Sequence, residues 1–246
     1  KGNIALLGRQ VINSGIVKAK LGKIAVGAGD SATLNFTKNK MINIIIPSQD
    51  LDKISDINGR TLRYLISNEG ELRAQGGIIE LSASAAKDLR RGTINNADTG
   101  SIIATGYDRK SGKITINSQN GRQNLSGRID VSNKDVKLPS GYVSISGDNV
   151  YNKSKISANG MNGGKVRLLS KNLLINDGQV EANGIDKGGE IIVMSEENLF
   201  SSVRSKLIAK GDKSGGSIKT SAKQINHSSG SLNVDSKSGS GGLIDI

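Results

Sequence analysis

A seven-residue pattern recurs along the chain, and this periodicity limits the fold more than any other feature of the sequence. The pattern reads Asn-x-Gly-x-apolar-x-Ala at residues 13–19, 68–74 and 176–182, and looser copies carry serine in place of glycine or end in valine. Its third position marks the copies at Gly15, Gly70, Gly100, Gly127, Ser154, Gly178, Ser205 and Gly230. These markers are 24 to 30 residues apart, except for a first gap of 55 that a degenerate copy at residues 40–44 would divide. Such periods are typical of solenoids, whose units stack on one another.

A second element, Gly-x-Ile/Val-x-apolar, accompanies each copy, as in Gly-Asn-Ile-Ala-Leu at residues 2–6. It recurs from Gly22, Gly77, Gly112, Gly141, Gly164, Gly189 and Gly242, and with a polar last residue from Gly216. A third element follows in the later periods, at residues 170–173, 195–199 and 221–225. Each element alternates apolar with polar residues, which indicates a short strand with one buried face.

Three such strands per period, separated by turns, describe one coil with a triangular cross-section. A single coil is too thin to bury its apolar face, so coils must stack at the strand spacing of about 4.8 Å. Crossovers between parallel strands are overwhelmingly right-handed. We therefore predict an all-β fold, a right-handed parallel β-helix of about nine to ten coils. The apolar positions Val17, Leu72, Ile102, Ile156 and Val180 should form one column.

The asparagines that begin the pattern have two explanations. Asn13, Asn68, Asn152 and Asn176 would occupy equivalent corners, where stacked side-chain amides would hydrogen-bond from coil to coil. Alternatively, asparagine is present because it tolerates the left-handed turn conformation. The sequence favours neither. The alanine that ends the pattern fits a corner where the core narrows.

The repeat fits worst at residues 37–63, where an apolar run at 42–46 precedes a polar stretch. We expect an excursion from the coil there, such as a hairpin laid on one face. The chain starts without methionine and ends in a full strand element without a polar cap. Because a free solenoid end needs covering, we expect a longer parent protein with more coils.

Composition argues against several classes of function. The 246 residues include no cysteine or tryptophan, two phenylalanines and four tyrosines, with a formal net charge of +12. Without cysteine there is no disulfide or thiolate metal site. The basic residues are interspersed with 22 acidic ones, and the aromatics that stack on single-stranded nucleic acid are scarce, so we predict no nucleic-acid partner. The longest apolar run is too short for membrane insertion.

Candidate catalytic groups are few. Asp50, Asp52 and Asp56 form the densest acidic group, but no matched acid and base lies beside them, so loop solvation explains them better. Glu196 and Glu197 fall at a turn, where solvated charge is ordinary. His227, the sole histidine, falls in a polar turn without a second histidine to complete a metal site. We predict no enzyme, no catalytic, cofactor-binding or metal-binding residue, and no cofactor.

Two repeated features invite a binding function. The glycine pairs at residues 163–164, 188–189, 215–216 and 241–242 are similar to phosphate-binding loops, but no Gly-Lys-Ser/Thr ending follows them, so we interpret them as turns. Outward basic residues form two predicted rows: Lys23, Lys113 and Lys165, interrupted by Ile78 and Glu190, and Lys18, Arg73 and Lys206, interrupted by Glu181. A stripe that binds anionic glycans is one hypothesis for these rows.

Several of these segments resemble, in order, the second half of the secretion domain of filamentous-haemagglutinin-like exoproteins. The matching segments are residues 2–8, 11–15, 22–29, 34–36, 68–70, 74–77 and 81–83. From residue 126 onward the sequence is similar to the less specific shaft repeats of the same family. The family's Asn-Pro-Asn-Gly-type motif, associated with secretion, has no counterpart here and normally lies upstream.

The resemblance implies that residues 1–125 are the C-terminal part of a haemagglutinin-type secretion domain and that residues 126–246 are β-helical shaft repeats. It implies a monomer secreted to the surface of a Gram-negative bacterium through an outer-membrane two-partner-secretion transporter, which would recognise a region mostly upstream. Adhesion to host-cell glycans or receptors would be its function. The alternatives are a haem- or haemopexin-binding exoprotein, the stalk of a contact-dependent growth-inhibition toxin and, more distantly, a carbohydrate-active β-helix enzyme.

Overall fold

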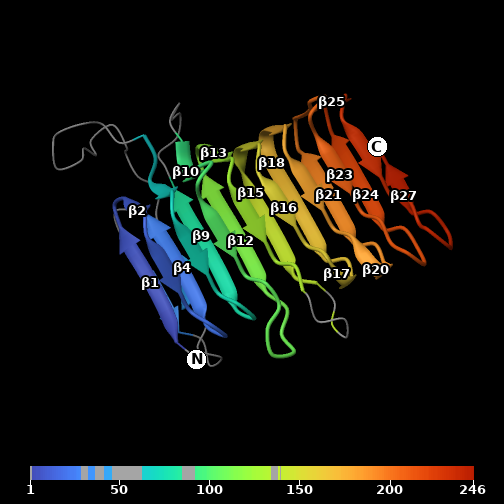
Figure 1. Cartoon of the computed structure of the whole chain (residues 1–246). Helices are drawn as coiled ribbons and strands as arrows, with labels where there is room; N and C mark the ends of the chain where they lie inside the picture. The colour runs from blue at the N-terminus through green and yellow to red at the C-terminus, as the bar shows by residue number, and fades with distance from the viewer. Residues whose placement is uncertain are drawn as a thin grey trace.

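The computed structural model describes residues 2–28, 33–36, 42–45, 63–84, 92–133, 138 and 140–246. Strands wind into a rod of stacked coils, and the chain advances along this rod from one end to the other (Figure 1). Among the described residues there is no helix, and hence none that is long and apolar enough to cross a membrane.

Every coil contributes one strand, or half of a long strand, to each of three faces. The strands within each face run parallel. The first face contains β1 (Asn3–Gly8), β4 (Lys23–Ala28), β9 (Ile78–Ser84), β12 (Lys113–Gln119), the first halves of β15 (Tyr142–Asn152) and β18 (Lys165–Asn176), β21 (Glu190–Ser195), β24 (Ser217–Ala222) and β27 (Leu243–Asp245). The second contains β2 (Val11–Asn13), β7 (Ile66–Asn68), β10 (Gly92–Asn96), β13 (Arg122–Leu125), the second halves of β15 and β18, β22 (Asn198–Ser201) and β25 (Ile225–Ser228). The third contains β3 (Ile16–Lys18), β8 (Glu71–Arg73), β11 (Ser101–Ile103), β14 (Arg128–Asp130), β16 (Lys155–Ser157), β19 (Gln179–Glu181), β23 (Lys206–Ile208) and β26 (Ser231–Asn233). The predicted all-β parallel β-helix is confirmed.

The predicted aliphatic column is present on the third face. The register places Val17 opposite Leu72, Leu72 opposite Ile102, and Ile156 opposite Val180, with Ile129 between the last two pairs. Leu72 is 1% exposed, and Ile102, Ile156 and Val180 are fully buried, whereas Val17 is half-buried in the first coil. The column holds because every strand places its middle side chain on the inner side of the same face.

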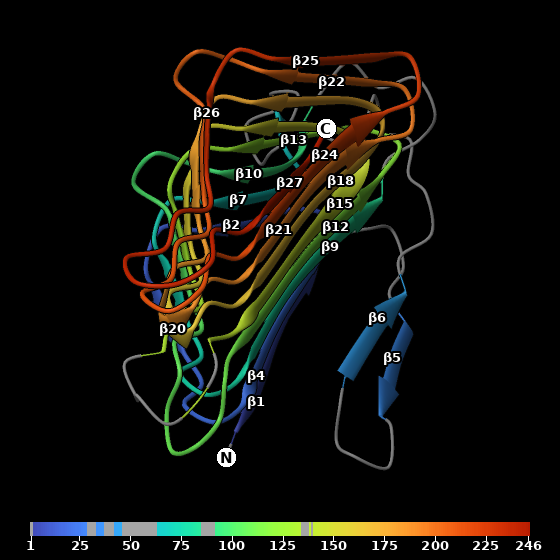
Figure 2. The same cartoon turned by 90° about the vertical axis from the view of Figure 1, so that its right-hand side faces the viewer.

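The described residues form eight complete coils followed by β27, slightly fewer than the nine to ten predicted. The predicted count included a coil for the degenerate copy placed at residues 40–44. That placement is wrong, because β8 pairs directly with β3 and leaves no coil between them. Instead, β6 (Ile42–Ile45) pairs antiparallel with β5 (Thr33–Phe36), in a hairpin that belongs to none of the three faces and contacts β4 (Figure 2). The expected excursion is thus confirmed for residues 42–45. Residues 37–41 and 46–62 lie outside the described residues.

The asparagines form a ladder inside one corner of the rod. Asn13 Nδ2 donates to Asn68 Oδ1 at 2.8 Å, and Asn68 Nδ2 donates to Asn96 Oδ1 at 2.7 Å. Further along, Asn152 Nδ2 donates to Asn176 Oδ1 at 2.7 Å. None of these asparagines has a positive φ. Stacked amides, rather than tolerance of a left-handed turn, therefore explain the residue type.

Leucine replaces asparagine at one step of this ladder. Leu125 lies in register between Asn96 and Asn152 and is fully buried. At this break, Asn96 Nδ2 donates to Gly100 O at 3.3 Å, and the backbone N–H of Ser154 donates to Asn152 Oδ1 at 3.2 Å. The ladder therefore has two segments, each closed by local partners.

Candidate functional site

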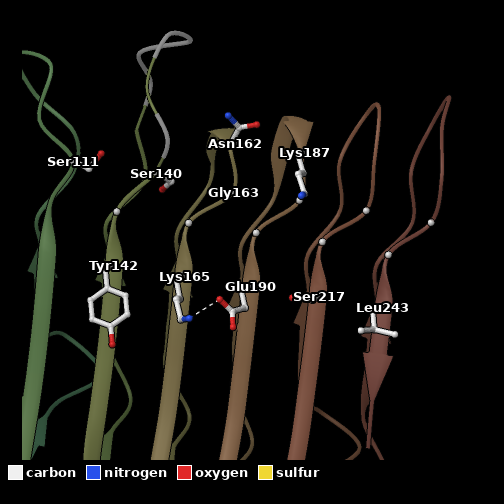
Figure 3. Close-up of a pocket in the computed structure, with 18 of the residues that line it drawn as sticks. Ser111, Ser140, Tyr142, Asn162, Gly163, Lys165, Lys187, Glu190, Ser217 and Leu243 are labelled. Carbon is white, nitrogen blue, oxygen red and sulfur yellow. Dashed lines mark ion pairs between the residues drawn. The ribbon is translucent and has the colours of Figure 1, made fainter.

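A groove of about 890 Å³ runs along the corner between the third and first faces (Figure 3). It crosses the starts of six successive first-face strands, β12, β15, β18, β21, β24 and β27. Its floor consists of Gly112, Gly141, Gly164, Gly189, Gly216 and Gly242. The groove therefore follows the long axis of the rod.

Glycine is needed in this floor because successive coils approach one another at the backbone. A Cβ on Gly164 would lie 2.2 Å from Gly141 O, and a Cβ on Gly189 would lie 2.1 Å from Gly164 O. The same close approach recurs at Gly216, 2.1 Å from Gly189 O. Any side chain here would force the coils apart. The strand-start glycines of the sequence pattern are thus a requirement of stacking.

The neighbouring N–H groups are already used within the solenoid. Gly164 N donates to Ala158 O at 2.8 Å, and Gly189 N donates to Ala182 O at 2.7 Å. A phosphate-binding loop instead offers several unpaired backbone N–H groups to its ligand. The interpretation of the glycine pairs as turns is therefore supported by their hydrogen bonds.

The walls of the groove are polar and weakly charged. Lys165 and Glu190, neighbours on the first face, form an ion pair with 2.6 Å between Nζ and Oε2 (Figure 3). Lys187 has no acidic partner among the residues that the structure describes, and Asn162 and Tyr142 complete this part of the wall. Such a groove suits an extended polar chain held by hydrogen bonds. Of the described residues that line it, Glu190 alone carries a carboxylate, and glycoside hydrolysis needs two.

The predicted acidic and histidine candidates are not brought together. Asp50, Asp52 and Asp56 lie outside the described residues. Glu196 and Glu197 are exposed at the bend before β22, as predicted. Across the described ranges, no three His, Cys, Asp or Glu side chains are grouped so that they could hold a metal ion.

His227 lies on a strand, so its prediction as a turn residue is wrong. It belongs to β25, which pairs with β22 and places Phe200 and His227 side by side on the outer face. Their ring centroids are 6.3 Å apart, and His227 Nε2 lies 2.8 Å from Ser229 Oγ. The alternation of the strand was hidden because Asn226 takes the inward position that leucine takes in the preceding coil.

The first predicted basic row is confirmed as a line of equivalent positions. Lys23, Ile78, Lys113, Tyr142, Lys165 and Glu190 follow one another in register. Its charge is partly neutralised within the protein, however. Lys23 is 4% exposed and pairs with Glu80, and Lys165 pairs with Glu190. This row is not a continuous stripe of free cations.

The second predicted row is wrong. Lys18 and Arg73 are paired in register, but Lys206 lies opposite Gln179, in the adjacent outward line that also contains Lys155. Lys206 is at the fourth position of the repeat and Lys18 at the sixth. Both positions face outward because side chains alternate with period two, so burial pattern alone does not separate them.

Sequence reasoning missed a hairpin turn at Asp108 and Arg109, where both residues have positive φ. The available signal was the long interval between Ala104 and Gly112, compared with the short one between Ala74 and Gly77.

The fold and the groove define an extended parallel β-helix with a polar groove along one corner. No protein-family model matches the sequence, and no curated protein matches it. The chain is similar to a solved structure, the crystal structure of the HMW1 secretion domain from Haemophilus influenzae, with a TM-score of 0.72 and 22% sequence identity. The match covers 99% of this chain and 63% of that one, so the chain spans less than two thirds of the neighbour's length. At this identity the likeness establishes a shared fold.

Proposed function

We propose that this chain is a non-enzymatic segment of a secreted, filamentous-haemagglutinin-like adhesin, exported by two-partner secretion and mediating attachment to cells or surfaces. The observation that carries the proposal is the extent of the fold likeness, since 99% of the chain aligns with a structure described as a secretion domain. The family resemblance of segments between residues 2 and 83 supports it from the sequence.

Residues 1–125 would be the C-terminal part of the secretion domain and residues 126–246 the first shaft repeats. The strands pair without a break across this division, since β14 pairs with both β11 and β16. The two regions would therefore differ in sequence type while sharing one solenoid. The transporter would recognise a region mostly upstream, and the protein would be a monomer at the Gram-negative cell surface.

Two physical features suit export followed by presentation. The chain has no cysteine, so no disulfide can form before it passes a membrane. Strand pairing joins each coil only to its neighbours, so folding can propagate from coil to coil as the chain emerges. The finished rod would hold a distal region away from the cell.

Export is tested with the full-length gene in a Gram-negative host, with and without the transporter gene that we expect beside it. We expect the protein in the medium only when the transporter is present, measured by immunoblot against a periplasmic marker. Equal amounts without the transporter would contradict two-partner secretion.

Attachment is tested with beads coated with the purified chain and added to cultured epithelial cells and to bacteria. We expect more bound beads than with albumin-coated beads, and no turnover of acidic polysaccharides. Binding of haem, followed by its absorbance, without cell attachment would favour the haem-binding alternative. Sedimentation velocity tests the monomer.

A further inference from the structure

A short hairpin projects from the rod between β11 and β12. Tyr107 N donates to Lys110 O at 2.9 Å, and Lys110 N donates to Tyr107 O at 3.0 Å. The two residues between them, Asp108 and Arg109, have φ values of 48° and 58°. This is the pattern of a type I′ turn, for which Asn-Gly or Asp-Gly is preferred. Arginine therefore occupies a position that favours glycine.

The hairpin packs against turns of the two preceding coils. Lys20 Nζ, in the turn before β4, lies 3.8 Å from the centroid of the Tyr107 ring. Gly76 lies in the turn of the coil between those of Lys20 and Tyr107. Its φ is 62°, and a Cβ there would be 2.7 Å from Tyr107 O. Gly76 N donates to Thr105 O at 2.7 Å, which fixes the base of the hairpin. The position of the exposed tip is thus determined by packing beneath it.

Five exposed cations lie on this hairpin, at the start of β12 that follows it, or beside the turn before β4 that it contacts, and we call them the cation platform: Lys18, Lys20, Arg109, Lys110 and Lys113. Within the described residues none of the five forms an ion pair, although Lys113 lies over the Tyr142 ring at 5.7 Å. Asp108 is the acid in the turn itself. Elsewhere on the rod, cations pair with acids of adjacent coils, as Lys213 does with Asp186 at 2.7 Å. The platform, with Asp108 included, therefore carries a net positive charge on a fixed support.

We propose that the cation platform binds a linear anionic polysaccharide bearing sulfate or carboxylate groups. The inference deepens the proposed function and rests on it, because such polymers meet the protein outside the cell. Lys20 and the hairpin belong to turns two coils apart, so the platform extends about 10 Å along the axis, which suits a chain of charges better than one isolated anion.

Two other polyanions fit the platform less well. Lys20 covers one face of the Tyr107 ring, so only the other face of this exposed ring is left for a nucleic-acid base, whereas single-strand binding stacks successive bases on several rings. A membrane surface would be favoured by an apolar face beside the cations, and the turn residues Asp108, Arg109 and Lys110 are all charged.

The test measures binding of the purified chain to dextran sulfate and to hyaluronate by biolayer interferometry, with neutral dextran, duplex DNA and vesicles rich in phosphatidylglycerol as comparisons. We expect binding to the anionic polysaccharides and none to neutral dextran. The double variant Arg109→Gln/Lys110→Gln should weaken this binding about tenfold. It should also lower the slope of log affinity against log salt by roughly 1.4, because each of the two cations that it removes releases about 0.7 of a counterion.

The matched control is Lys171→Gln/Lys223→Gln, which removes the same charge from two exposed lysines at another corner. We expect it to change affinity less than twofold. Equal weakening in both double variants would overturn the proposal, because binding would then follow net charge alone. Tighter binding to duplex DNA or to vesicles would overturn it in favour of another partner.

Arg109→Gly separates binding from stability. Glycine should relieve the left-handed conformation, so the variant should melt at an equal or higher temperature while affinity for dextran sulfate falls about threefold. Unchanged affinity in this variant and in the double variant would overturn the proposal. Export is measured separately by immunoblot, so a failure of polysaccharide binding leaves the proposed two-partner secretion standing.

Discussion

The asparagine ladder should carry a large share of the stability of the later coils, and Asn176 is the residue at which to measure it. Asn176 is fully buried, accepts a hydrogen bond from Asn152 Nδ2 at 2.7 Å and donates one to Ser205 Oγ at 2.5 Å. Asn176→Ala would leave both partners buried without that bond. Each unsatisfied buried polar group costs about 1–3 kcal/mol.

We therefore expect Asn176→Ala to lower the free energy of unfolding by about 3 kcal/mol and the Tm by roughly 6–12 °C. The measurement is urea unfolding followed by circular dichroism, together with calorimetry. Asn149→Ala is the matched control, because Asn149 is an outward, half-buried residue of the same strand as Asn152. This control should change the free energy of unfolding by less than about 0.5 kcal/mol.

A double-mutant cycle tests the ladder directly. Once Asn176 is alanine, truncating Asn152 removes an amide that has already lost its acceptor, so the two effects should fall short of additivity by about 1 kcal/mol or more. If Asn176→Ala cost no more than Asn149→Ala, or if the two ladder variants were additive, the stacked amides would not stabilise the rod and this reasoning would be refuted.

Three further predictions address glycine, leucine and charge. Gly189→Ala would place a Cβ 2.1 Å from a backbone carbonyl oxygen and should cost about 2 kcal/mol or more, whereas Gly241→Ala meets nothing within 4 Å and should be near neutral; thermal melts of both check this. Leu125→Asn should destabilise less than Leu125→Ala in urea titrations, because an amide there can join the two segments of the ladder. The hydrogen bond from Arg204 holds the pKa of Asp177 below its ordinary value of 3.8, so the pair stabilises the fold above that pH and the effect is lost as pH falls through the lower folded value. Asp177→Asn should therefore be less stable than the natural protein at pH 7, by no more than about 1 kcal/mol, and the difference should diminish as the pH falls below 3.8 in acid-unfolding curves.

The turns that line the candidate site could be predicted from the sequence, but the groove that they form together could not. The turns at Gly164 and Gly189 were predicted correctly from their recurrence, yet the groove exists only because six such turns stack. The hairpin at Arg109 was missed, because its support comes from Lys20 and Gly76 in earlier coils.

The sequence by itself determined the coil, its three strands and the column that includes Leu72 and Ile102. This was possible because each strand pairs with its own equivalent in the next coil, so local alternation and period together specify the packing. The tertiary structure determined the features that the repeat period does not specify. It placed residues 42–45 in a separate hairpin and made the asparagines partners of one another. It also assigned Lys206 to a different row from Lys18. The sequence does not distinguish the two rows, because both are exposed and neither requires an apolar residue.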